Sequence, residues 1–422
     1  MDTLAFSVDG RHLFYKAFDH GQWIVVTDDK EGDRYDYVGS LVISPGGERL
    51  AYLAGVSGRT FWVIDGEEGR NFDSFAADTI IFTPDGNHYA YSGNVLRVMG
   101  KDEGMVVFDG KDSKAYDSVD HPVLSNDGNR IAYEAQVGGK WCLVVDGRES
   151  RMYDNTGYSP VFSSDGNRLA YAIWDEDHMK MVVDGKEGKA YRYVTQPIFS
   201  PSGKHVAYAV VVNEKAGVVV DGEEGSLFDG VLTPTLVFSP NSDRFAYVAT
   251  RAGKAVVVVD GRESESYDDI LEDGIRFSPD SRHVAYGVFK DGKYFVVLDG
   301  VRQKRFDSIG NRSLTFSLDS RRFAYTASDG SRKFVVEGDH EHKSYDGFVL
   351  NGRLFFSPDS KLLLYAAIKG ECVFMVVEEN EGLCRQSILG SGVVFDKVDS
   401  FHYVAVADNK FVMGTKKING TH

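Results

Sequence analysis

Hydrophobic and polar positions along the chain follow one pattern, which occurs ten times in full and an eleventh time in shortened form. Each copy has an apolar strand, a turn of the Ser-Pro-Asp-Gly type, a strand containing Ala-Tyr, a valine-rich strand, an Asp-Gly turn and a Tyr-Asp dipeptide. Asp-Gly between apolar runs supplies the positive backbone angles that tight hairpins need. No segment shows a sustained helical period. The pattern predicts antiparallel four-stranded units, which in one copy begin at residues 160, 168, 181 and 189.

The serine or threonine of the first turn fixes the register of the repeat. These residues are Ser7, Ser44, Thr83, Ser125, Ser163, Ser200, Ser239, Ser278, Ser317 and Ser357, so the period is 37 to 42 residues. A tyrosine follows each of them eight positions later, whereas the eleventh copy has Val404 there. Self-similarity at about 40 residues with four short strands is the signature of propeller blades. The first strand is nearly all apolar, which predicts an innermost strand covered on both faces.

Proline placement predicts how the copies are organised into domains. All ten prolines occupy the first strand or the turn after it, and no Ser/Gly tract or charge block separates the copies. We therefore predict an all-β fold over residues 1–422, a single large β-propeller of about ten to eleven four-stranded blades, made of ten full repeats plus one truncated repeat. Two fused smaller propellers are the alternative.

The first turn also carries a family resemblance. Phe199-Ser200-Pro201-Ser202-Gly203, Phe277-Ser278-Pro279-Asp280 and Phe356-Ser357-Pro358-Asp359 resemble the Phe-Ser-Pro-Asp-Gly turn of the WD-repeat-like propeller family of the TolB type. The resemblance covers nearly the whole chain, although Val-Asp-Gly stands where true WD repeats have Trp-Asp. It implies a platform for binding proteins or small molecules, and it brings no general catalytic motif.

Composition narrows the classes of partner. The net charge is −16, and many of the acids are turn aspartates on one side of the predicted ring, so we expect one strongly acidic face. Such a face disfavours nucleic acid and anionic membranes and is compatible with a basic protein or peptide. No apolar run approaches the roughly 20 residues of a membrane span. We expect a monomer.

The N-terminus and the cysteines bear on the compartment. The chain starts Met-Asp-Thr-Leu without a signal-peptide pattern, and Cys142, Cys372 and Cys384 occupy unrelated repeat positions. These features suit a reducing compartment and argue against a disulfide framework. We predict a cytoplasmic protein, or an exported one if a signal peptide has been trimmed.

Histidines offer little support for a metal site. His12, His88, His205 and His283 share one repeat position with arginines of other copies, which indicates strand-edge residues far apart. His340 and His342 flank Glu341 and can approach a metal, yet no cysteine or acid pattern completes the usual four ligands. We predict no metal and no cofactor.

Binding residues are expected where the copies differ, in the loops between strands two and three and between successive blades. We predict that Trp174 has no equivalent at its repeat position and is an aromatic anchor in an acidic surround, suited to a basic or sugar-like ligand. Local cover for the blade core is the other interpretation. The full candidate set is Trp174, Asp175, Asp177, His178, Tyr158, Gln196 and Arg353.

Catalysis finds no motif in the sequence: there is no nucleophile elbow, no cysteine with a histidine partner and no phosphate-binding glycine loop. We predict a non-enzymatic binding platform. The alternative is a carbohydrate- or peptide-processing enzyme with its site at the central channel, and a purely structural module is a third possibility. One first-strand position is expected to line that channel in part, with Ser40, Thr79, His121, Ser159, Gln196, Thr235, Ser313 and Arg353.

Overall fold

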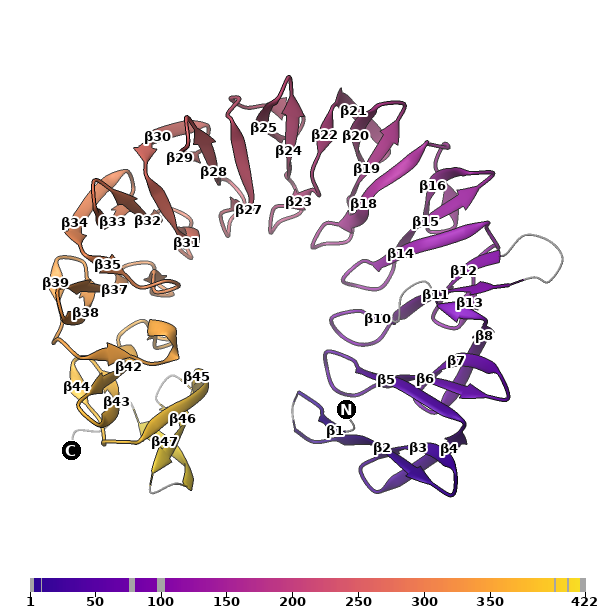
Figure 1. Ribbon diagram of the computed structural model, residues 1–422, viewed down its shortest axis with the longest axis horizontal. Helices are drawn as coiled ribbons and strands as arrows, with labels where there is room; N and C mark the ends of the chain where they lie inside the picture. The colour runs from indigo at the N-terminus through magenta and orange to yellow at the C-terminus, as the bar shows by residue number, and fades with distance from the viewer. Residues whose placement is uncertain are drawn as a thin grey trace. The chain divides into compact units, whose positions relative to one another are not determined.

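A computed structural model describes residues 4–8, 10–75, 80–96, 103–397, 400–407 and 410–417. Within these residues the chain is built of short β-strands and one 3-10 turn, η1 (Leu350–Gly352). The strands form successive antiparallel sheets in chain order (Figure 1). The predicted fold class, an all-β protein of propeller blades, is confirmed.

Blades 1 to 6 are the sheets that begin at β1, β5, β9, β14, β18 and β22. Their strands are β1 (Leu4–Phe6), β2 (Leu13–Asp19), β3 (Gln22–Thr27), β4 (Lys30–Tyr35); β5 (Tyr37–Ile43), β6 (Leu50–Val56), β7 (Arg59–Ile64), β8 (Glu67–Phe72); β9 (Ser74–Phe75), β10 (Ile81–Phe82), β11 (Tyr89–Val95), β12 (Glu103–Phe108), β13 (Lys111–Asp112); β14 (Ser118–Leu124), β15 (Ile131–Val137), β16 (Lys140–Val145), β17 (Arg148–Glu149); β18 (Asn155–Phe162), β19 (Leu169–Asp175), β20 (His178–Val183), β21 (Lys186–Tyr191); β22 (Tyr193–Val194), β23 (Ile198–Phe199), β24 (Val206–Val212), β25 (Lys215–Val220) and β26 (Glu223–Glu224).

Blades 7 to 11 begin at β27, β31, β35, β40 and β45. Their strands are β27 (Gly230–Phe238), β28 (Phe245–Arg251), β29 (Lys254–Val259), β30 (Arg262–Tyr267); β31 (Asp269–Phe277), β32 (Val284–Lys290), β33 (Lys293–Leu298), β34 (Val301–Phe306); β35 (Ser308–Ile309), β36 (Thr315–Phe316), β37 (Phe323–Asp329), β38 (Arg332–Glu337), β39 (His340–Glu341); β40 (Gly347–Phe348), β41 (Leu354–Phe356), β42 (Leu363–Lys369), β43 (Cys372–Val377), β44 (Asn380–Glu381); β45 (Ser387–Lys397), β46 (Ser400–Ala407) and β47 (Lys410–Lys417). Blade 11 has three strands among its described residues, which matches the shortened eleventh repeat.

The first strand of a blade is interrupted in its middle. In blade 5 the register runs from Tyr158↔Ala172 to Val161↔Ala170, so Ser159 and Pro160 lie outside the ladder. In blades 6, 9 and 10 the first strand is split into two pieces. Each polar residue of the predicted channel position lies at such an interruption, except Thr79, which falls outside the described residues.

Burial is deepest in the second and third strands. The run Leu169–Ile173 of β19 is fully buried, whereas most of β18 is half-buried. The expectation that the first strand is covered on both faces is therefore wrong for blade 5, because the interruption of the strand leaves Ser159 only half-buried.

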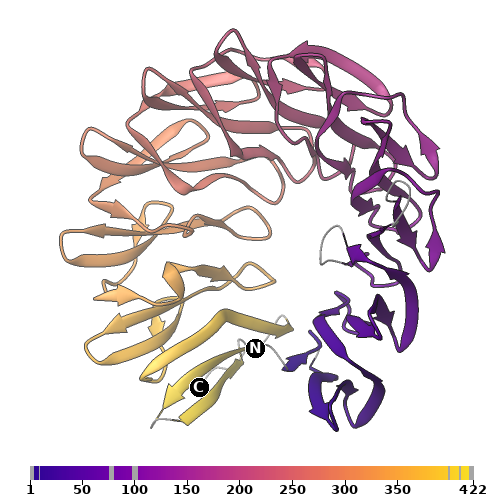
Figure 2. The same cartoon turned by 45° about the vertical axis from the view of Figure 1, so that its right-hand side comes forward.

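Within each unit, successive blades lie face to face (Figure 2), and hydrophobic clusters extend from one blade to the next. Blades 5 and 6 share a cluster that includes Ala172, Met179, Met181 and Tyr208. The tyrosine of each Tyr-Asp dipeptide is also buried, as Tyr153 illustrates at 3% exposure. The repeat therefore forms its core between neighbouring sheets rather than within one.

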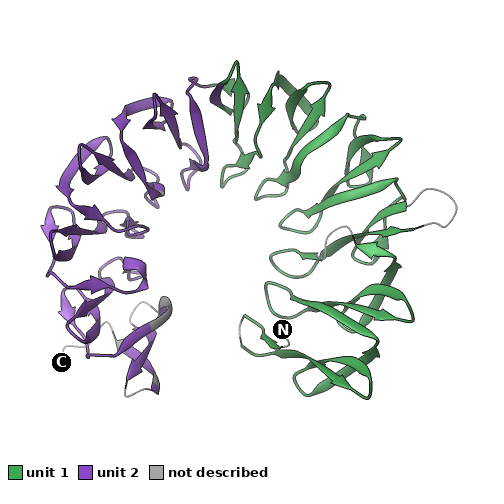
Figure 3. Ribbon diagram, viewed as in Figure 1, with its two compact units in different colours: residues 1–214, 218–224 green, residues 215–217, 225–422 purple. Residues whose placement is uncertain are grey.

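The chain divides into two compact units (Figure 3). Unit 1 comprises residues 1–214 and 218–224, and unit 2 comprises residues 215–217 and 225–422, so the boundary falls within β25. The organisation as one domain or as two fused propellers stays a prediction. The described residues contain no helix of the length and apolarity needed to cross a lipid bilayer.

A disulfide joins Cys372 to Cys384, with their Cα atoms 5.1 Å apart, while Cys142 is buried as a free thiol. The expectation of no disulfide was wrong. The bridge between Val373 and Arg385 aligns the segment after β44 with the start of β43, and this pairing brings the two cysteines together. Because disulfides persist in oxidising compartments, the cysteines no longer support a cytoplasmic location.

Candidate functional site

The loops between the second and third strands are held by the aspartate of the Tyr-Asp dipeptide. Asp154 accepts the backbone N–H of Glu176 in blade 5 (2.7 Å) and an N–H of Lys140 Nζ in blade 4 (3.1 Å). The same aspartate-to-loop bond recurs at Asp36, Asp73, Asp117, Asp229, Asp268, Asp307 and Asp346. The dipeptide therefore fastens each loop to the preceding blade and gives the variable residues a rigid frame.

The opposite edge of a blade carries a second repeated contact. Arg130 donates from Nε to Asp146 (3.0 Å) and from Nη1 to the carbonyl oxygens of Gly166 and Asn167 in the next blade (3.1 and 3.0 Å). Where histidine replaces arginine, it keeps the carboxylate contact, as in the 2.6 Å pair of His283 with Asp299. We call this contact the turn clasp. It pairs many turn aspartates with cationic or imidazole groups, so the count of acids overstates the charge of this face.

Trp174 lies in β19, opposite Asn155 and Met179. It is half-buried and packs against the shared core of blades 5 and 6. Phe18 and Phe289 occupy the same register position in their blades, so the prediction that Trp174 has no equivalent is wrong. Its indole still leaves part of its surface to solvent, as an anchor requires.

Tyr158 lies on the same face of blade 5 as Trp174, and Tyr193 of blade 6 contacts Tyr158. Tyr158 is opposite Ala172, two residues before Trp174 on the same face of β19, and diagonal neighbours at this spacing are within reach of aromatic side chains. The rings of Tyr158 and Tyr193 meet edge to face with centroids 6.3 Å apart, and their hydroxyls are hydrogen-bonded. That bond raises the pKa of Tyr158 to about 12. We call Tyr158, Trp174 and Tyr193 the aromatic patch.

The loop residues next to the patch divide into paired and exposed groups. Asp175 accepts bonds from Arg151 Nη2 (2.9 Å) and Lys180 Nζ (2.8 Å). The lysine and arginine lower the pKa of Asp175 to about 2. Asp177 and His178 are exposed, so of the two predicted acids Asp177 presents its carboxylate to solvent while Asp175 is tied into the blade.

The remaining two candidates lie at interruptions of a first strand. Gln196 is exposed in blade 6, in the segment between β22, which contains Tyr193, and β23. Arg353 belongs to unit 2 and is exposed directly after η1. Its backbone N–H donates a hydrogen bond to the carbonyl oxygen of Leu350 (3.2 Å). The structure thus gathers Tyr158, Trp174 and Gln196 on blades 5 and 6, and it describes Arg353 in the other unit.

A buried carboxylate in blade 4 was missed by the sequence reasoning. Glu134 is 3% exposed and lies 3.1 Å from His121 Nδ1, with a further bond to the Thr156 hydroxyl. Burial raises the pKa of Glu134. At its register position most other blades have small or aliphatic residues such as Ala172 and Val248, although blade 1 has Lys16. An acid at a position where most copies have a small or aliphatic residue is the signal that alignment of the copies offers.

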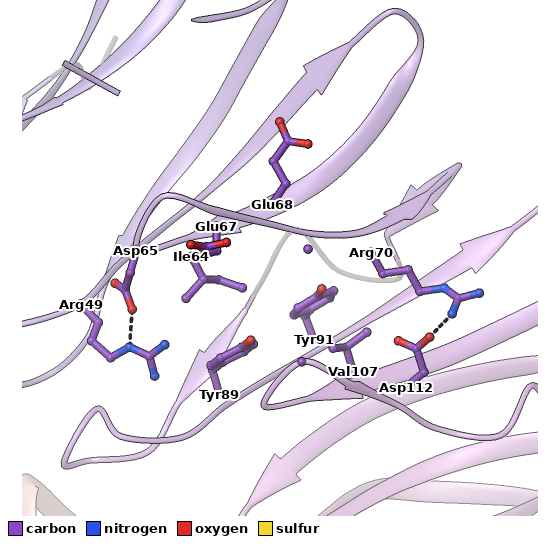
Figure 4. A pocket seen from close by; sticks show the side chains of 12 residues that line it. Arg49, Ile64, Asp65, Glu67, Glu68, Arg70, Tyr89, Tyr91, Val107 and Asp112 are labelled. Carbon is purple, nitrogen blue, oxygen red and sulfur yellow. Dashed lines mark hydrogen bonds and ion pairs between the residues drawn. The ribbon is translucent and has the colours of Figure 1, made fainter. Parts of the chain in front are cut away.

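Grooves between outer strands form another repeated feature. In unit 1 a groove of about 420 Å³ lies between blades 2 and 3 (Figure 4). Figure 4 shows an ion pair at each end, Arg49 with Asp65 and Arg70 with Asp112, and the rings of Tyr89 and Tyr91 between them. Grooves of about 430 and 850 Å³ between later blades have equivalent arginine, aspartate and tyrosine linings. These grooves follow from the repeat, so no single one of them is marked out as the site.

Comparison with known proteins leaves the family open. No family model matches the chain, and no curated protein sequence matches it. It is similar to a solved eukaryotic initiation factor, at 12% identity over 72% of this chain and 88% of the other with a TM-score of 0.39. It is also similar to the propeller domain of the Trilobed protease from Pyrococcus furiosus (15% identity, 64% and 96% coverage, TM-score 0.33) and to TolB from Acinetobacter baumannii (15%, 62% and 75%, 0.25). At these identities and scores they assign no family and no function.

Proposed function

We propose that the protein is a non-enzymatic binding platform that recognises a basic protein or peptide through the aromatic patch on blades 5 and 6. The grouping of Tyr158, Trp174 and Tyr193 is the observation that carries the proposal. Aromatic side chains on a rigid frame offer large contact area at little conformational entropy, which is the property of interface hot spots.

The frame around the patch supports this proposal. The bond from Asp154 to the Glu176 amide and the pairing of Asp175 with Arg151 and Lys180 hold the loop in one conformation. A pre-organised surface loses little conformational freedom on binding. The exposed carboxylates of Glu176 and Asp177 add negative charge at the edge of the patch, where they favour encounter with a cationic partner.

Selection from a random peptide library on the intact chain tests the proposal. We expect enriched peptides to combine lysine or arginine with an aromatic or aliphatic residue. The repeat supplies conservative variants: Trp174→Val, Tyr158→Thr and Tyr193→Asn introduce the residues found at Val211, Thr195 and Asn155 in the same register of a neighbouring blade. Each should weaken binding about tenfold or more, the loss typical of a hot-spot aromatic.

Phe289→Val is the matched control, because Phe289 has the register position of Trp174 but lies in blade 8. It should leave peptide affinity unchanged. Peptides that bind all the variants as tightly as the parent chain would refute recognition at the aromatic patch.

The enzyme alternative has one observation in its favour. The Glu134 carboxyl group, with a raised pKa and a histidine beside it, has the character of a general acid. Hydrolysis of chromogenic glycosides or peptide anilides by the parent chain but not by Glu134→Gln would support this alternative over the platform. Equal background rates in both chains would dismiss it for those substrates.

A further inference from the structure

We propose that blades 9 and 10 hold a divalent transition-metal ion, Zn²⁺ in the first instance, between His340, His342 and Glu379. One ligand atom from each of these residues lies within 4.8 Å of the other two. Glu379 belongs to the turn between β43 and β44 of blade 10, whereas both histidines come from blade 9. The carboxylate ligand that completes the pair of histidines is therefore Glu379 of the next repeat, and not Glu341 between them.

The geometry of the three side chains is close to that of a metal site. His340 Nε2 lies 2.9 Å from Glu379 Oε1, and the two imidazole rings have centroids 5.1 Å apart. Bonds of about 2.0–2.2 Å in a tetrahedron set neighbouring ligand atoms about 3.3–3.5 Å apart. Ligand atoms at the 4.8 Å limit therefore need to approach by about 1.5 Å at most, and the His340 and Glu379 atoms need to separate by about 0.5 Å. Two imidazoles and one carboxylate form a recurrent zinc ligand set that leaves one position open.

His342 is exceptional within the repeat. At its register position five copies have glycine (Gly32, Gly69, Gly188, Gly225 and Gly382), three have serine (Ser113, Ser150 and Ser264) and blade 8 has Gln303. A small residue suits this position because the blade tyrosine of the next repeat lies over it, as at Gly69, where an added Cβ would be 2.6 Å from the Tyr91 hydroxyl. The imidazole of His342 is nonetheless 97% buried there.

Neighbouring polar groups fix the orientation of that imidazole. The Glu337 carboxylate is 3.5 Å from His342 Nε2, and the Tyr365 hydroxyl is 3.5 Å from Nδ1. Metal-binding histidines commonly contact a carboxylate through the nitrogen that does not bind the ion. Glu337 is itself held by Arg322, which donates to both of its oxygens.

Glu379 also departs from the repeat. Glu379 has a positive φ of 61°. In seven other blades the residue at this position also has a positive φ but is a glycine (Gly66, Gly110, Gly147, Gly185, Gly222, Gly261 and Gly300). A side chain in this conformation is unfavourable by about 1 kcal/mol. Its carboxylate accepts the backbone N–H of Lys343 in blade 9 (3.0 Å) and faces His340, so the two blades meet at this acid.

Zinc titration of the tag-free, chelator-treated full chain tests the site. We expect one Zn²⁺ per chain by calorimetry and by metal analysis after dialysis, and a tetrahedral visible spectrum when Co²⁺ replaces it. Glu379→Gly and His342→Ser restore the residues of other blades, so both should fold, and each should weaken zinc binding at least tenfold. His178→Ser, which removes an exposed histidine of unit 1, is the control and should bind as the parent does.

Circular dichroism of each variant without metal reports folding separately from binding. Because glycine removes the positive-φ penalty, Glu379→Gly stays informative even if His342→Ser misfolds. Absence of stoichiometric zinc binding by the parent chain would overturn the proposal. Equal affinity of the parent and Glu379→Gly would also overturn it.

Discussion

Removal of one turn clasp should loosen a blade from its neighbour by a measurable amount. Arg130 of blade 4 makes three polar contacts, one with Asp146 and two with carbonyl oxygens of blade 5, and its guanidinium lies 5.1 Å from the centre of the Phe162 ring. The Arg130→Ala variant loses all of them. The Arg130→His variant introduces the side chain of other blades and keeps the carboxylate contact, as His283 does with Asp299.

The magnitude follows from these contacts. The ion pair is partly exposed and contributes about 0.2–1 kcal/mol. Each bond to a carbonyl contributes about 0.5–1.5 kcal/mol net, and the guanidinium over the ring about 0.5–1 kcal/mol. Because neighbouring contacts are not additive, we expect about 2–3 kcal/mol for Arg130→Ala and about 1–2 kcal/mol for Arg130→His.

Hydrogen exchange measured by mass spectrometry is the suitable assay, because it reports local opening in a protein of many blades. The peptide that spans residues 163–169 contains the contacted turn, where the Gly166 amide bonds Ser163 (2.9 Å). At about 1.4 kcal/mol per factor of ten, its protected amides should exchange about 30- to 140-fold faster in Arg130→Ala and about 5- to 30-fold faster in Arg130→His.

Arg148→Ala is the matched control, because Arg148 is an exposed arginine of the same blade. It should leave the exchange of the 163–169 peptide unchanged. A change below threefold in Arg130→Ala, or an identical change in the alanine and histidine variants, would refute the view that arginine holds the next blade through its carbonyl groups.

Three further predictions concern other contacts of the repeat. Asp154→Asn should speed exchange of the Glu176 amide, measured by mass spectrometry, because a neutral amide is a weaker acceptor for that N–H; no change would contradict the role of the Tyr-Asp dipeptide. Acid should unfold the chain as the pH falls from about 4 toward 2, followed by circular dichroism. The Ser125 hydroxyl and the Asn129 side chain lower the pKa of Asp127 to about 2. The stability that the ionised Asp127 contributes is therefore present above its ordinary pKa of 3.8 and is lost as the pH falls through 2. Asp127→Asn should make the unfolding transition less dependent on pH, and an unaltered transition would contradict this role of Asp127. Alkylation of the unfolded, unreduced chain should label Cys142 alone, and all three cysteines after reduction; three labels without reductant would disprove the disulfide.

Much of the fold could be predicted from the sequence because its turns are local. Asp-Gly forms a positive-φ hairpin turn after the third strand of most copies, as at Asp184-Gly185, so those strand boundaries follow from a few adjacent residues. The burial of the first strand could not be predicted from its apolar composition, because the interruption at positions such as Ser159 depends on pairing with the second strand.

The candidate site could be predicted only in part, since its contacts cross between copies. Tyr158 and Trp174 belong to one copy and were selected, whereas Tyr193 comes from the next blade and was not. Glu379 was missed for the same reason: it lies 37 residues beyond His342 in the chain, and only the packing of blades 9 and 10 brings the two together. The register position of each residue would have shown that Phe289 matches Trp174 and that His342 replaces a small residue.

We propose that the repeated polar residues build the frame while recognition belongs to the aromatic patch. Hydroxyl-radical footprinting distinguishes these two roles, because tyrosine, phenylalanine and tryptophan side chains are labelled efficiently and can be followed one by one. With a selected peptide bound, we expect reduced labelling of Trp174 and Tyr193 and unchanged labelling of Phe18, which is 61% exposed in blade 1. Unchanged labelling of the aromatic patch, with protection at Phe18 or in the outer grooves, would contradict it.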